Sequence, residues 1–160
     1  IIQVAHNLAF IGKFSEAITL YKKALKIAPH GPLPVRLFLL KTYTETGVPE
    51  ASEELAKELI LQEETHKKFW GTAFYASILY EKNKIKVGKE VLDDFLKQND
   101  MSFEEFIDEI WLSPFTGTIT GDYDPVIDDV VYNLKMIYDP SLIDKSVEES
   151  KGWTGGSQKD

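Results

Sequence analysis

The chain opens with two patterns of apolar residues at helical spacing, and the two patterns meet at Gly12. In both stretches the positions i, i+3, i+4 and i+7 are apolar or small, which is typical of one buried helix face. Gly12 supplies the left-handed backbone that ends a helix, Ser15 suits the N-cap of the next helix, and Pro29 ends that helix. The pattern predicts two helices joined by a tight turn. Their face residues are Val4, Ala5, Leu8 and Ile11, then Phe14, Ala17, Ile18, Tyr21, Ala24, Leu25 and Ile27.

The same arrangement recurs twice. A second helical pattern runs to Gly47, 35 residues after Gly12, and a third begins near Phe69 and reaches Asn83, 36 residues after Gly47. Asn is the next best residue to Gly at positive φ. The helix after each turn carries small and large apolar residues at matching offsets. These residues are Val48, Ala51, Leu55 and Leu59 after Gly47, and Ile85, Gly88, Leu92 and Phe95 after Asn83.

The first unit resembles a tetratricopeptide repeat, whose pattern has a Gly–x–aromatic turn followed by Ala, an aromatic residue, Ala and Pro. The matching residues are Gly12, Phe14, Ala17, Tyr21, Ala24 and Pro29. The resemblance implies an all-α fold, a right-handed α-solenoid of about three helix pairs over residues 1–99, with the first repeat truncated at its N-terminus. In such an array the first helix of each pair lines the concave side, and neighbouring pairs share one core.

Residues 100–150 are expected to add capping helices. Ser102 and Glu105 form a capping box before an apolar pattern that ends near Ser113. Residues 115–124 read as a loop, and a broad aliphatic stripe then predicts a helix over residues 125–138. We expect this last helix to be part of the array, either closing over the preceding helix or folding back into the groove. Its polar side is assigned to Asp128, Asp129, Asn133 and Lys135, and residues 151–160 are predicted to be a flexible tail.

The composition and the absence of certain motifs argue against several classes of function. The net charge of −8 argues against a nucleic-acid partner, and no apolar run approaches the about 20 residues of a membrane helix. The chain has no cysteine, its three histidines stand far apart, and no nucleophile motif occurs, so we expect neither an enzyme nor a cofactor. The carboxylates around Asp124 lack the spacing of an EF-hand and are interpreted as helix caps and solvated groups. The lack of cysteine suits an intracellular, cytoplasmic location.

We therefore expect the function to depend on binding at the surface of the protein. If the repeat alignment holds, the concave groove presents apolar and aromatic residues suited to an apolar or amphipathic peptide or helix. Lys41 alone matches the basic set that tetratricopeptide domains use for acidic chaperone tails. One hypothesis is a scaffold or adaptor segment of a larger chain or assembly that binds another protein. The alternative is a purely structural solenoid segment whose C-terminal helices cover the groove. The predicted groove residues are His6, Phe10, Leu37, Lys41, Trp70, Ser77 and Tyr80.

Overall fold

The computed structural model describes residues 2–28, 33–47, 49–112, 125–139 and 141 of the chain. Within these residues it contains eight α-helices and no strand, so the predicted all-α class is confirmed there. The expected loop at 115–124 and the expected tail at 151–160 lie outside the described residues. The helices are α1 (Ile2–Phe10), α2 (Phe14–Ile27), α3 (Leu33–Thr46), α4 (Pro49–Ile60), α5 (Thr65–Glu81), α6 (Ile85–Gln98), α7 (Phe103–Leu112) and α9 (Pro125–Tyr138).

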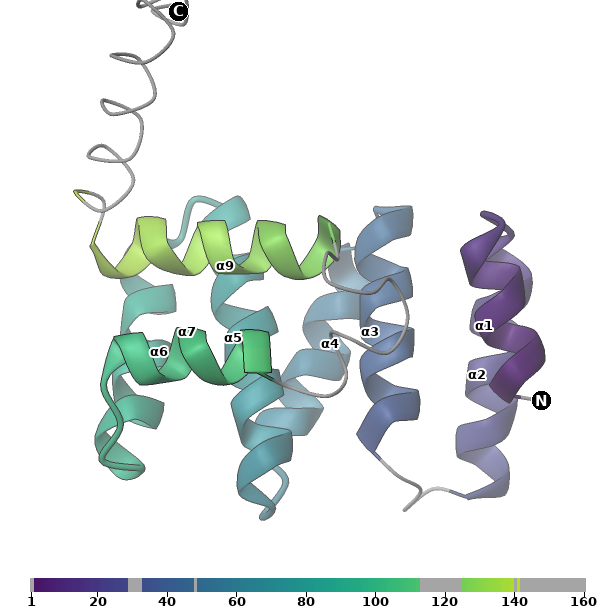
Figure 1. Cartoon of the computed structure of the whole chain (residues 1–160), viewed down its shortest axis with the longest axis horizontal. Coiled ribbons are helices and arrows are strands. Elements are labelled where there is room, and N and C mark those ends of the chain that lie inside the picture. The colour runs from purple at the N-terminus through teal and green to yellow at the C-terminus, as the bar shows by residue number, and fades with distance from the viewer. Residues whose placement is uncertain (1, 29–32, 48, 113–124, 140, 142–160) are drawn as a thin grey trace, which may run out of the picture.

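Helices α1 to α6 pack against their neighbours in chain order. Figure 1 shows them side by side, with α1 and α2 at one end, while α7 and α9 run across their direction. An aromatic cluster joins α7 to this row: the ring of Phe106 lies 4.4 Å from that of Phe69 and 5.6 Å from that of Phe95. The core is therefore shared between the row of helices and the crossing α7.

The turns between paired helices have the predicted backbone. Gly12 and Gly47 adopt φ values of 86° and 71°, and Asn83 adopts 64°. At Gly12, the Gly12 and Lys13 amides donate to the carbonyls of Ala9 and Leu8, which is the Schellman arrangement that satisfies the last carbonyls of a helix. The same pair of bonds follows α5 at Asn83. The turn prediction is confirmed at all three positions.

A fourth turn of this kind, which the sequence reading missed, connects α6 to α7. Asp100 has a φ of 49°, its amide donates to the carbonyl of Lys97, and the Met101 amide donates to that of Leu96. Asp tolerates this conformation better than most residues. The predicted capping box follows directly and is confirmed: Ser102 Oγ accepts from the Glu105 amide at 3.0 Å, and Glu105 accepts from the Ser102 amide at 2.9 Å.

Two helix starts differ from the prediction. Ser15 was expected to cap α2, but α2 begins at Phe14 with Lys13 in the N-cap position and no side-chain cap bond. The Schellman turn at Gly12 already directs the chain into the new helix, so Ser15 lies inside its first turn, where its carbonyl accepts from Thr19. Helix α5 begins at Thr65, one turn before Phe69, where the apolar pattern starts.

Helix α9 is part of the packed core, as predicted. It packs chiefly on α5, also on α6, and touches α3 and α7; Figure 1 shows it crossing the row from α3 to α6. One assignment within it was wrong: Asn133, expected on the polar outer side, is buried. Asn133 is three residues after Val130 and four before Ile137, and this spacing places it on the same face. The six stripe residues, all buried, are Val126, Ile127, Val130, Val131, Leu134 and Ile137.

Candidate partner-binding groove

The seven predicted groove residues come from the first helix of each pair, α1, α3 and α5, as the alignment requires. Their accessibility differs widely. Phe10, at the end of α1, is 78% exposed, and His6 and Tyr80 are partly buried. The other four have relative exposures between 2% and 6% and belong to the interior: Leu37, Lys41, Trp70 and Ser77. The most exposed of the predicted groove residues, Phe10, therefore lies at the α1 end.

At that end, His6 joins α1 to its neighbours. Its Nδ1 atom is 2.6 Å from the Tyr21 hydroxyl of α2, and its ring centroid lies 4.0 Å from that of Phe38 on α3. Burial lowers the pKa of His6, and the positive charge of Lys41 lowers it further. Burial also raises the pKa of the Tyr21 phenol. The hydrogen bond therefore joins a neutral imidazole to a protonated phenol, and the pair ties α1 to the core.

In the middle of the predicted groove, Ser77 faces α9 instead of solvent. The amide nitrogen of the Asn133 side chain donates to Ser77 Oγ at 2.9 Å, and both residues are buried. Because each polar group would be costly to bury alone, the bond fixes which turn of α9 lies against α5. Sequence reasoning missed Asn133. The available signal was a single amide within an aliphatic stripe, at helical spacing from its buried neighbours.

Trp70, four residues before Phe74 on α5, belongs to an aromatic group rather than to an open surface. Its ring lies 5.3 Å from that of Phe69, edge to face, and 6.3 Å from that of Phe74. Trp70 is only 5% exposed. Replacing it with Ala would remove core volume, which costs about 3–5 kcal/mol for a large aromatic side chain. Trp70→Ala is therefore a test of stability before it is a test of binding.

Metal-binding side chains do not gather in the described part of the chain. Within it, no three His, Asp or Glu side chains are placed to hold a metal ion. Asp124, at the centre of the carboxylate group considered above, lies outside the described residues, and Asp128 and Asp129 are exposed on α9. None of the described helices is long and apolar enough to cross a membrane.

Comparison with known proteins adds no relative. No protein-family model matches the chain, and neither the curated proteins nor the solved structures contain a significant match. The described residues define an all-helical protein.

Proposed function

We propose that this chain is a non-catalytic scaffold segment: a right-handed solenoid of tetratricopeptide-like helix pairs whose concave groove is filled by its own helix α9. The repeated positive-φ turns and the packing of α1 to α6 in chain order support the array. The proposal rests mainly on the packing of α9 against α5. In this reading the segment gives a larger assembly shape and rigidity, and its groove is not the site where a partner docks.

The depth of the α9 contact supports a permanent occupant. Ile127 and Leu134 are fully buried, and burial of each such side chain contributes about 1.5–3 kcal/mol. The stripe has six aliphatic residues, so release of α9 would forfeit the burial of all six side chains. The Asn133–Ser77 bond adds a polar contact that only one register satisfies. These features are those of a core helix, as expected for the atypical helix that closes a repeat array.

A second candidate function is peptide binding at the α1 end of the concave side. Phe10 favours it, because this ring is 78% exposed next to the His6 cluster, and exposed aromatic residues are frequent anchors of protein interfaces. An apolar or amphipathic segment from another protein would suit this part of the surface. This candidate keeps the adaptor hypothesis but moves the contact away from Trp70 and Ser77.

A disulfide lock tests the proposal. The chain has no cysteine, so Ser77→Cys with Asn133→Cys introduces a single pair across the α5–α9 contact. Ser77→Cys with Asp128→Cys is the matched control, because Asp128 is exposed and lies about 140° around α9 from Asn133. We expect oxidation to crosslink the first pair and not the second.

The locked chain then serves as bait in an affinity purification, beside the same sample after reduction. If α9 is permanent, locked and reduced chains retain the same partners. Loss of partners on locking, with recovery on reduction, would show that α9 must leave the groove and would contradict the proposal. A loss caused instead by Phe10→Ala, in a folded chain, would favour the second candidate.

A further inference from the structure

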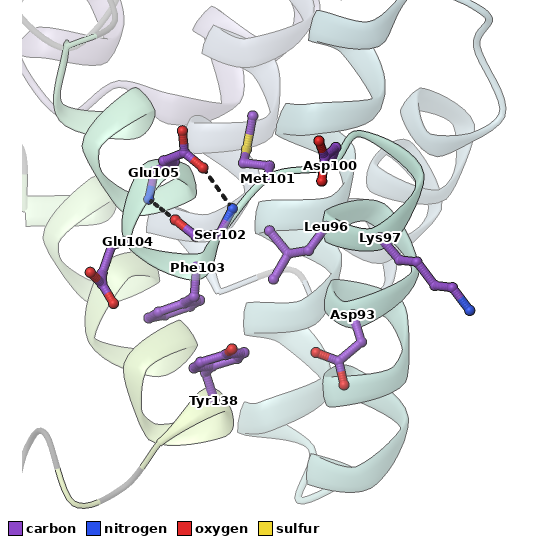
Figure 2. A pocket seen from close by; sticks show the side chains of 10 residues that line it. All are labelled: Asp93, Leu96, Lys97, Asp100, Met101, Ser102, Phe103, Glu104, Glu105 and Tyr138. Atoms are coloured by element: carbon purple, nitrogen blue, oxygen red, sulfur yellow. Dashed lines mark hydrogen bonds between the residues drawn. The ribbon is translucent and has the colours of Figure 1, made fainter.

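A cleft of about 710 Å³ lies where the α6–α7 turn meets the end of α9, away from the predicted groove residues. Figure 2 shows its walls: the rings of Phe103 and Tyr138 on one side, and side chains of α6 on the other. The residues that line it come from α6, the turn at Asp100, the first turn of α7 and the last residue of α9. They are Asp93, Leu96, Lys97, Asp100, Met101, Ser102, Phe103, Glu104, Glu105 and Tyr138.

The cleft has an apolar base. The Phe103 and Tyr138 rings stack with centroids 4.2 Å apart and an angle of 4° between their planes. Tyr138 remains 37% exposed, so this pair presents aromatic surface to solvent. Leu96 is nearly buried, and Met101 is partly buried beside it. The base can therefore receive one apolar side chain, with an adaptable methionine as part of its wall.

The rim is acidic. Asp93, Asp100 and Glu104 are exposed carboxylates from three successive segments, whereas the Glu105 carboxylate is held by the Ser102 amide. The one lysine of the lining, Lys97, extends away from the other lining groups in Figure 2. The local charge is therefore negative, in a chain whose net charge is −8. A positively charged partner would be attracted over a distance and then oriented by the rim.

The chain's own Lys89 places a cation against the aromatic and acidic groups of the cleft. Its ammonium lies 4.6 Å from the centroid of the Tyr138 ring and 3.9 Å from an Asp93 carboxylate oxygen. Lys89 is not among the lining residues, so it flanks the cleft without filling it. Phe103 and Lys89 both contact the Tyr138 ring, so the rim carboxylates of Asp100 and Glu104 are the groups that face a second cation.

We propose that this cleft binds a basic extended segment of another protein, with arginines on either side of one apolar side chain. The apolar side chain lies on Leu96, Met101 and the ring pair. The guanidinium groups pair with Asp100 and Glu104, because the planar fork of a guanidinium matches carboxylate geometry. This surface is separate from the groove, so the proposal does not depend on the proposed function.

The test uses a fluorescein-labelled peptide, Arg-Arg-Leu-Arg between glycines, and fluorescence anisotropy with the full chain. The test variant is Asp100→Asn with Glu104→Gln. Asn also tolerates positive φ, so the turn is retained. The matched control is Asp108→Asn with Glu109→Gln, which neutralises two exposed carboxylates of α7 outside the cleft. We expect saturable binding that the test variant weakens about five-fold or more and the control leaves within about two-fold.

Two further peptides separate the contribution of the arginine charges from that of the leucine side chain. Replacing the arginines with citrulline keeps the shape and removes the charge, and we expect it to abolish binding. Replacing the leucine with glycine should weaken binding several-fold. The proposal is overturned if no saturable binding occurs, if both variants weaken binding equally, if the citrulline peptide binds as well, or if the leucine makes no difference. Equal weakening would indicate general attraction to an acidic protein.

Discussion

Gly71 provides the sharpest test of the packing. It lies in α5 against α4, and a Cβ atom at this position would be 2.7 Å from the Ile60 backbone nitrogen and 2.9 Å from the Ala56 carbonyl oxygen. Real Cβ atoms essentially never approach so closely, and backbone atoms of a helix move only with the helix. Gly71→Ala therefore forces α4 and α5 apart.

Gly88 is the matched control, because it also lies in a helix against its neighbours. There the nearest atom to an added Cβ would be Cδ1 of Ile137 at 3.2 Å, followed by the Ala76 carbonyl oxygen at 3.3 Å. The first is the end of a flexible side chain that can rotate, and the second distance is short but possible. The two glycines thus receive the same chemical change in different surroundings.

The magnitudes predict a large loss of stability at Gly71 and a small change at Gly88. Replacing Gly with Ala within a helix stabilises the folded chain by about 1 kcal/mol. Overpacking costs about 1–3 kcal/mol, and the backbone contacts place Gly71 at the upper end. We expect Gly71→Ala to lower the free energy of unfolding by about 2 kcal/mol. At Gly88, a strained Ile137 rotamer costs about 0.5–1.5 kcal/mol, so Gly88→Ala should change that free energy by less than about 1 kcal/mol.

Urea unfolding followed by far-ultraviolet circular dichroism measures both variants. The midpoint should shift for Gly71→Ala while the denaturant slope stays unchanged, since the surface exposed on unfolding is the same. The reasoning is refuted if Gly71→Ala is as stable as the original chain, or if Gly88→Ala is the more damaging substitution.

Three other predictions concern the turns, α9 and His6. Gly12→Val or Gly47→Val should lower the free energy of unfolding by about 1 kcal/mol or more, because a β-branched residue resists positive φ; an unchanged urea midpoint would contradict this. A fragment of residues 1–113 should aggregate or melt well below the full chain, since α9 no longer covers α5 and α6, and an equal melting temperature would refute it. The pKa of His6 is lowered on folding, so the unfolded chain binds its proton more readily, and stability should fall as the pH drops below about 6.5. His6→Gln should reduce this loss between about pH 7.5 and 5.5, measured by urea unfolding; carboxylates with lowered pKa values titrate below that window.

Local features of the fold could be predicted from the sequence. The turns at Gly12 and Gly47 depend on one residue's freedom at positive φ, and the capping box at Ser102 depends on a partner three residues away. The α9 stripe follows from spacing within a single helix. In each case the interaction lies within a few residues of the chain, so the sequence alone determines it.

The candidate site was decided by tertiary structure. The sequence placed Phe10, Trp70 and Ser77 on the first helices of the pairs, but the fold leaves Phe10 exposed, buries Trp70 and sets Ser77 against Asn133, 56 residues further along the chain. The closeness of α4 and α5 at Gly71 also appears only when both helices are in place. A residue's own helix fixes the face on which it lies. Whether that face is covered depends on a distant helix, whose position follows from packing the whole core, and no local pattern contains that information.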